Sequence, residues 1–140
     1  MIMHGVLVAL LDRERWRGVL IVGPSGSGKS DLAFRLMHEG FQLVADDQVV
    51  VWSSGGRAWG RAPESIAGLV EARGYGILPT SVRDLSGIDL VVDVDPAAKI
   101  ERMPDPSALE VAGIALPLVR QRALDGSAAA KIRRWLMALG

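Results

Sequence analysis

The sequence predicts an α/β domain with a mixed β-sheet that carries hairpins. Three observations lead to this fold class. A glycine-rich phosphate-binding pattern lies between an apolar run and a helical run, other apolar runs have the length of strands, and some of these runs are joined by very short polar links. Short links join antiparallel strands, whereas parallel strands need long crossover connections, so a chain with both kinds of connection forms a mixed sheet.

Length and composition limit the classes of protein that fit. We expect residues 1–140 to form a single domain, since a chain of this size buries roughly two-thirds of its unfolded surface. Sixteen basic residues balance sixteen acidic ones, which gives no electrostatic case for binding nucleic acid or a membrane. The absence of cysteine excludes disulfides and thiol nucleophiles. With no apolar run near the roughly 18 residues of a membrane span and no secretory signal, we expect a cytoplasmic protein.

The first two strands are predicted to form a hairpin. Val6–Leu11 is a continuous apolar run, typical of a strand that is covered on both faces. The polar link Asp12–Gly18 separates it from a second run, Val19–Val22. His4 lies just before the first strand, and an isolated histidine in that place is more often an exposed terminal residue than a catalytic one.

Residues 23–30 fit the P-loop pattern of glycine, four residues and Gly-Lys-Ser. Glycines allow successive N–H groups to turn toward phosphate oxygens, and the start of the next helix adds to the same anion site. In this pattern the lysine reaches the β- and γ-phosphates and the serine hydroxyl binds Mg²⁺. A plain glycine turn before a helix is the disfavoured alternative. The predicted nucleotide-binding residues are Gly23, Pro24, Ser25, Gly26, Ser27, Gly28, Lys29 and Ser30.

The helix that follows is expected to end at Gly40, and the next strand, Phe41–Ala45, leads directly to Asp46 and Asp47. Downstream of a P-loop, one carboxylate can hold Mg²⁺ and another can accept a proton from an attacking hydroxyl. The competing interpretation is a turn, because aspartate favours turns and a strand resumes at Gln48. The P-loop favours the functional interpretation.

The middle of the chain is predicted to contain a hairpin over 48–62 and then a helix. Pro63 suits the first turn of a helix, and residues 64–72 carry apolar side chains at helical spacing. The glycine-spaced segment 73–77 follows. Together with Glu71 it is either a helix end with a surface ion pair or an active-site loop.

A second strand with acidic residues at its end, Ile88–Asp95, is a rival for the metal-binding role, although Asp95 also suits a capping residue. Residues 109–119 contain a glycine and a proline, which favours an edge strand or two short strands over a helix. From Ser127 onward the apolar spacing predicts a final helix.

Several of these motifs, taken in order, resemble the HPr kinase/phosphorylase family. The motifs are His4-Gly5-Val6-Leu7-Val8, the P-loop followed by Asp31, Leu43-Val44-Ala45-Asp46-Asp47-Gln48-Val49, Glu71-Ala72-Arg73-Gly74-Tyr75-Gly76-Ile77 and Ile100-Glu101-Arg102-Met103. The resemblance implies a P-loop kinase domain similar to the C-terminal domain of HPr kinase. It also implies an ATP- and Mg²⁺-dependent protein serine kinase that phosphorylates the phosphocarrier HPr in the regulation of carbon metabolism through the phosphotransferase system.

The resemblance also implies a role for each matching residue. His4 becomes an active-site histidine, which reverses the interpretation of that residue alone. Lys29 binds phosphates and Asp47 accepts the proton in transfer and returns it in the reverse reaction. Arg102 neutralises phosphoryl charge. The implied metal ligands are Ser30, Asp46 and Glu71, and either Asp46 or Asp47 can be the base.

Two departures from the family pattern change the expectations. The chain begins at the first catalytic motif, so we expect the family's N-terminal regulatory domain to be absent. In the family, a C-terminal loop with a Pro-Gly turn is implicated in phosphorylase activity. Residues 117–122 lack this turn, so we expect weak phosphorolysis. Phosphate and pyrophosphate would be further ligands of that reaction. Long members are hexamers, which leaves a homo-oligomer open. The alternative functions are a small-molecule kinase of the P-loop type and a non-catalytic nucleotide-binding switch module.

Overall fold

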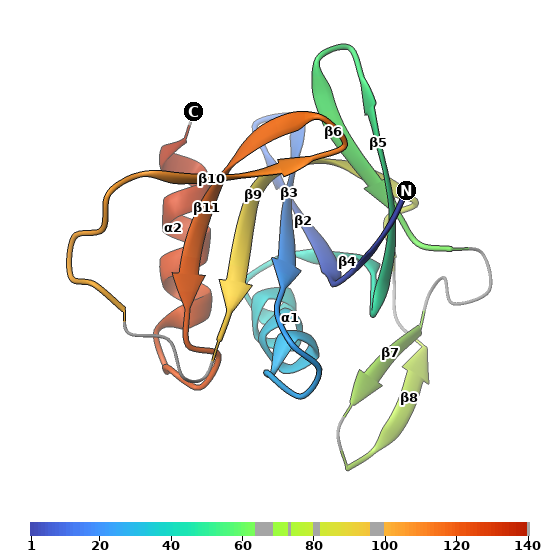
Figure 1. Ribbon diagram of the computed structural model, residues 1–140. Coiled ribbons are helices and arrows are strands. Elements are labelled where there is room, and N and C mark those ends of the chain that lie inside the picture. Colours follow the sequence, from blue (N-terminus) through green and yellow to red (C-terminus); the bar gives the residue numbers. More distant parts are fainter. Residues whose placement is uncertain (64–68, 73, 80–81, 96–99, 140) are drawn as a thin grey trace.

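The computed structural model describes residues 1–63, 69–72, 74–79, 82–95 and 100–139. Figure 1 shows a curled sheet with two helices against it and a separate small hairpin. The strands are β1 Ile2–His4, β2 Val6–Asp12, β3 Arg15–Val22, β4 Gln42–Ala45, β5 Gln48–Ser54, β6 Arg57–Arg61, β7 Leu69–Ala72, β8 Gly76–Pro79, β9 Leu85–Val94, β10 Ser107–Val111 and β11 Ile114–Gln121. The helices are α1 Lys29–His38 and α2 Ala128–Ala138.

The main sheet is mixed, as the sequence predicts. Its strands follow the order β1-β5-β6-β9-β3-β2-β4, and β11 pairs with both β9 and β10. The pairs β3–β9 and β9–β11 are parallel, whereas β2–β3, β2–β4 and β5–β6 are antiparallel. The directions of these pairs place the carboxyl ends of β3, β4, β9 and β11 at one edge of the sheet. Ligand sites of open α/β sheets lie at such an edge.

Both faces of the central strands are covered, which explains their continuous apolar runs. In β2, Val6, Val8 and Leu10 face the cluster beneath α1 and α2, whereas Leu7 and Ala9 face a second cluster enclosed by the curled sheet. Each fully buried aliphatic side chain of this size contributes about 1.5–3 kcal/mol. The core therefore fixes the strands whose ends form the sheet edge described above.

Most predicted elements are confirmed. The β2–β3 hairpin, the β5–β6 hairpin, the two strands within 107–121 and the last helix all form. Helix α1 ends as expected at Gly40, where Gly40 N–H donates to Met37 O and Phe41 N–H donates to Leu36 O. Across the described residues, no helix has the length and apolar character needed to cross a membrane.

The helix predicted over 64–72 is wrong for its last four residues. Leu69–Ala72 form strand β7, which pairs antiparallel with β8 in a hairpin separate from the main sheet. Residues 64–68 lie outside the described residues. Gly74 and Gly76 have φ values of 88° and 99°, a geometry that favours a chain reversal over a continuing helix.

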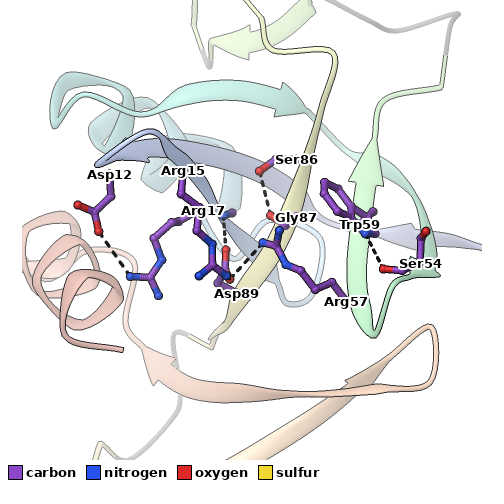
Figure 2. Close-up of polar contacts among 10 residues, drawn as sticks. Asp12, Arg15, Arg17, Ser54, Arg57, Trp59, Ser86, Gly87 and Asp89 are labelled. Carbon is purple, nitrogen blue, oxygen red and sulfur yellow. Dashed lines mark hydrogen bonds and ion pairs between the residues drawn. The ribbon is translucent and has the colours of Figure 1, made fainter. Parts of the chain in front are cut away.

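A buried carboxylate holds three strands together toward the amino end of β3, away from the P-loop (Figure 2). Asp89 of β9 lies 3.0 Å from Arg15 Nη2 and 3.4 Å from Arg57 Nη2, and its other oxygen accepts the Gly18 N–H at 3.1 Å. The Asp89 side chain is only 11% exposed. Its contacts join β9 to β3 and β6, the strands on either side of it. This cluster has a structural role in aligning the central strands.

Candidate active site

The P-loop connects β3 to α1, in the strand, loop and helix order that the sequence predicts. Gly23 has a φ of 151°, and a Cβ atom there would lie 2.3 Å from Val94 O. Gly28, with φ of 97°, is the N-cap residue of α1. Two backbone positions of the loop therefore require glycine, one because β9 approaches closely and one because the backbone is left-handed.

Lys29 and Ser27 lie inside this loop. The Lys29 ammonium group donates to Gly23 O at 2.8 Å and to Pro24 O at 2.9 Å, and the residue is 8% exposed. The Ser27 hydroxyl is buried and, among the described residues, no protein group accepts from it or donates to it. A buried hydroxyl is normally hydrogen-bonded, so Ser27 is suited to a ligand oxygen or a water.

Asp46 faces the start of α1. It follows β4, and its Oδ1 accepts a hydrogen bond of 2.8 Å from the Ser30 hydroxyl. Asp46 is 8% exposed. The neighbouring strand β2 holds β4 in register, with Leu7 opposite Ala45. Burial of a carboxylate is costly unless it is hydrogen-bonded, and Ser30 supplies one such bond.

Asp47 faces the other way. Its φ is 70°, and the Gln48 N–H donates to Asp46 O across it at 2.9 Å. His4 Nε2 lies 3.1 Å from Asp47 Oδ1, with both side chains more than half exposed. The Gly5 N–H also donates to Asp47 O at 3.0 Å. Non-glycine residues in such turns cost about 1–3 kcal/mol and are concentrated at functional sites.

The predicted residues thus divide into those that meet and those that do not. Ser30, Asp46, Asp47 and His4 come together beside the P-loop. The acidic residues at the end of the rival strand 88–95 include Asp93, which lies within β9 in register with Val22 of β3 and with Arg120 of β11. Of the adjacent pair, Asp46 therefore contacts Ser30 and Asp47 contacts His4.

Two further predicted residues lie outside this group of contacts. Glu71 is opposite Ile77 in the β7–β8 hairpin, and β7 has backbone neighbours in α1. Arg102 is exposed between β9 and β10, and no hydrogen bond or ion pair within the described residues involves it. Among the residues that the structure describes, no group of three His, Cys, Asp or Glu side chains is arranged to hold a metal.

A loop that the sequence left without a structural role also reaches the P-loop. Residues 121–125 are the last residue of β11 and the four that follow it, and a Cβ atom on Gly28 would lie 2.8 Å from Ala123 Cβ. Arg35 of α1 donates to the carbonyl oxygens of Ala123 and Asp125. These partners are backbone atoms about ninety residues along the chain, so no local pattern signals the contact.

The site's residues fit a nucleoside triphosphate with Mg²⁺. The loop has a lysine at its base, a buried serine hydroxyl without a protein partner and a glycine backbone that β9 approaches closely. The Ser30 hydroxyl and the Asp46 carboxylate are oxygen ligands, which Mg²⁺ prefers, and Mg²⁺ commonly takes only one or two carboxylates in addition to phosphate oxygens.

Known proteins with similar sequences carry the same family name. An HPr kinase/phosphorylase of Brevibacillus brevis is 37% identical over 128 residues, covering 83% of this chain and 40% of the relative. An HPr kinase/phosphorylase of Streptococcus sanguinis is 35% identical over 129 residues, covering 84% of this chain and 40% of the relative. The chain therefore spans about 40% of the length of these curated relatives.

The fold also matches a solved structure, that of the HPr(Ser) kinase/phosphatase from Coxiella burnetii. The TM-score is 0.80 at 21% identity, covering 99% of this chain and 89% of the other. This likeness supports the fold that the sequence predicts. The family model described as the HPr Serine kinase C-terminal domain matches residues 1–130. Since this match includes the P-loop, both aspartates and every strand of the sheet, the chain belongs to the HPr serine kinase C-terminal domain family.

Proposed function

We propose that this chain is the catalytic domain of an ATP- and Mg²⁺-dependent kinase that phosphorylates a serine of the phosphocarrier HPr in the cytoplasm. The observation that carries the proposal is the division of two adjacent carboxylates beside a P-loop. Asp46 contacts the serine that ends the P-loop motif, whereas Asp47 is exposed and contacts His4. The names of the relatives supply the protein substrate.

The buried half of the site, with Lys29, Ser30 and Asp46, is suited to binding phosphate and a metal ion. The N–H groups at the start of α1 and the Lys29 ammonium group bind phosphate oxygens. Ser30 and Asp46, already 2.8 Å apart, would hold Mg²⁺ as oxygen ligands. Bound MgATP supplies the phosphoryl group and a cation that offsets its developing charge. Lys29 is fixed by two carbonyl oxygens, so little reorganisation is needed when phosphate binds.

The exposed half of the site, Asp47 and His4, is suited to proton transfer. The Asp47 carboxylate is 66% exposed, so it can approach a serine hydroxyl on the surface of another protein. In the proposed reaction Asp47 accepts that hydroxyl proton, which typically contributes about 10²–10⁴-fold to a rate. His4 orients the carboxylate through its contact at Oδ1. The fixed turn at residues 46–48 keeps the carboxylate in place.

Two residues complete the proposal from the family resemblance. Glu71 is a third metal ligand, a role that the backbone proximity of β7 to α1 supports. Arg102 neutralises charge on the phosphoryl group. Because Arg102 is exposed and has no polar partner within the described residues, this role requires it to reach the site when substrates are bound.

Incubation with ATP, Mg²⁺ and HPr, followed by mass spectrometry of the HPr peptides, tests the proposal. We expect one added phosphate on a serine, and none when that serine is alanine. Turnover of ATP with a small-molecule acceptor and unmodified HPr would favour a metabolite kinase. Tight ATP binding without turnover would favour a switch module.

A further inference from the structure

The loop at the end of β11, residues 121–125, is fixed to the P-loop helix by several polar contacts. Arg35 of α1 donates from Nη1 to Asp125 O at 3.1 Å and from Nη2 to Ala123 O. Its Nε lies 3.4 Å from Asp31, one turn earlier in α1. One guanidinium therefore joins the P-loop helix to two carbonyl groups of the loop.

The loop is also held from within. Gln121, which is 8% exposed, donates from its amide nitrogen to Arg122 O at 2.9 Å and contacts Asp125 Oδ2 at 3.3 Å. Asp125 Oδ1 lies 3.5 Å from Arg122 Nε. The Asp125 N–H donates to Arg122 O at 3.2 Å. These contacts fix the backbone of the loop and hold Arg122 Nε near Asp125.

This arrangement differs from what the sequence alone predicts. The replacement of the family's Pro-Gly turn predicts a less preorganised anion site and weak phosphorolysis. The contacts instead show a loop fixed by side chains, with Ala123 packed against Gly28 of the P-loop. Side-chain hydrogen bonds to carbonyl groups can fix a turn as proline and glycine do, because both restrict the backbone.

We infer that Arg35 is a positioning residue that fixes the 121–125 loop so that Arg122 binds phosphate oxygens at the P-loop. Three observations support this inference, which rests on the proposed function. Arg122 follows a strand whose carboxyl end lies at the P-loop edge of the sheet. Its side chain is 52% exposed, so it is accessible to a ligand. Arg35 has no need to contact the ligand, since its partners are carbonyl groups of the loop.

The inference is tested by a double-mutant cycle on pyrophosphate affinity, measured by calorimetry with Mg²⁺. We expect Arg122→Ala and Arg35→Met each to weaken binding by about 10-fold, the usual effect of losing a charged hydrogen bond. The double variant should bind no more weakly than Arg122→Ala, because Arg35 acts through Arg122. Arg35→Lys, which keeps a donor for one carbonyl, should recover part of the affinity.

Arg134→Met is the matched control, because Arg134 is an exposed arginine on α2. It should leave pyrophosphate affinity within about 2-fold of the original. If Arg35→Met does not fold, Asp125→Ala removes the Asp125–Arg122 contact from the loop side and should show the same lack of additivity with Arg122→Ala. The inference would be overturned if the two single losses of pyrophosphate affinity multiply in the double variant. It would also be overturned if Arg35→Met binds pyrophosphate as tightly as the Arg134→Met control.

A second readout separates this inference from the proposed function. With serine-phosphorylated HPr and inorganic phosphate, the reaction gives pyrophosphate and unmodified HPr. We expect the wild-type protein to catalyse this reaction readily, whereas the missing Pro-Gly turn alone predicts a weak reaction. In Arg35→Met, the KM for phosphate should be raised by about 10-fold. A protein that binds pyrophosphate with the expected cycle but does not modify HPr would contradict the proposed function alone. If phosphate is transferred to HPr at the normal rate but the effects of Arg35→Met and Arg122→Ala on pyrophosphate affinity are additive, only the role of Arg35 would be contradicted.

Discussion

Asp46 and Asp47 are adjacent in the sequence, yet their carboxylates have different neighbours and different exposure. The positive φ of Asp47 and the hydrogen bond from Gln48 to Asp46 reverse the chain between the two side chains. Asp46 therefore faces Ser30 in a buried position, and Asp47 faces His4 at the surface. A buried acid beside a hydroxyl suits a metal ion, whereas an exposed acid suits a proton from another protein.

Lys29→Ala should weaken ATP binding and lower phosphate transfer by about 10²-fold or more, because it removes a cation held beside the phosphates. Fluorescence titration with ATP and a radiolabel transfer assay measure the two effects. Lys131→Ala is the control, since Lys131 is exposed on α2. A Lys29→Ala variant with the transfer rate of the control would contradict the P-loop assignment.

At the scale of elements, the strands and the last helix could be predicted because their apolar patterns agree with their positions. Both faces of β2 are buried, so its run is continuous, and α2 buries Ile132 and Leu136 four residues apart. Residues 69–72 could not be assigned in this way. A run of four residues fits either a strand or a helix, and its partner β8, not its own pattern, decides the conformation.

The candidate site was predictable to the extent that its residues lie in contiguous motifs. The P-loop and the two aspartates directly follow strands, so their chemistry is visible in the sequence. The contacts of Arg35 are not visible, because its partners are carbonyl groups of residues 123 and 125, which any amino acid would present. Residue spacing by itself gives no sign that His4 and Asp47 meet, since β1 must first pair with β5; only the family resemblance assigns both to the active site.

The P-loop and β9 form one tightly packed unit at Gly23. Gly23→Ala would place a Cβ atom 2.3 Å from Val94 O, so the loop must move away from the strand. We expect ATP affinity to fall by about 10-fold or more, since small displacements of a binding group have large effects. Gly55→Ala in the β5–β6 hairpin is the control, because Gly55 also has a positive φ, 60°, but no atom beyond its chain neighbours lies within 4 Å of the added Cβ. Equal ATP affinities for the two variants, measured by calorimetry, would show that this packing does not shape the site.

At the scale of the whole molecule, the sheet separates the site from the contacts that hold its strands together. The P-loop, Asp46 and the 121–125 loop lie at the carboxyl ends of β3, β4 and β11, whereas Asp89 lies toward the other end of β3. One sheet edge therefore carries the chemistry, and the contacts of Asp89 align the strands that support it.

Asp89→Ala tests this separation. It removes the acceptor of the Gly18 N–H and the partner of Arg15 and Arg57, so the free energy of unfolding should fall by about 1–3 kcal/mol. ATP affinity of the folded protein should stay within about 2-fold. Urea denaturation and calorimetry measure the two quantities, with the exposed Asp84→Ala as the control. Loss of ATP affinity at unchanged stability would show that Asp89 belongs to the site.

The central claim, that Asp47 accepts the serine proton while the buried half of the site binds nucleotide, is tested most directly by the rate of HPr phosphorylation in Asp47→Asn. The substitution keeps size and polarity but removes the base. The account predicts unchanged ATP affinity and a rate at least about 10²-fold lower, with Asp93→Asn close to wild type. A normal rate in Asp47→Asn, or the predicted loss in Asp93→Asn instead, would contradict it.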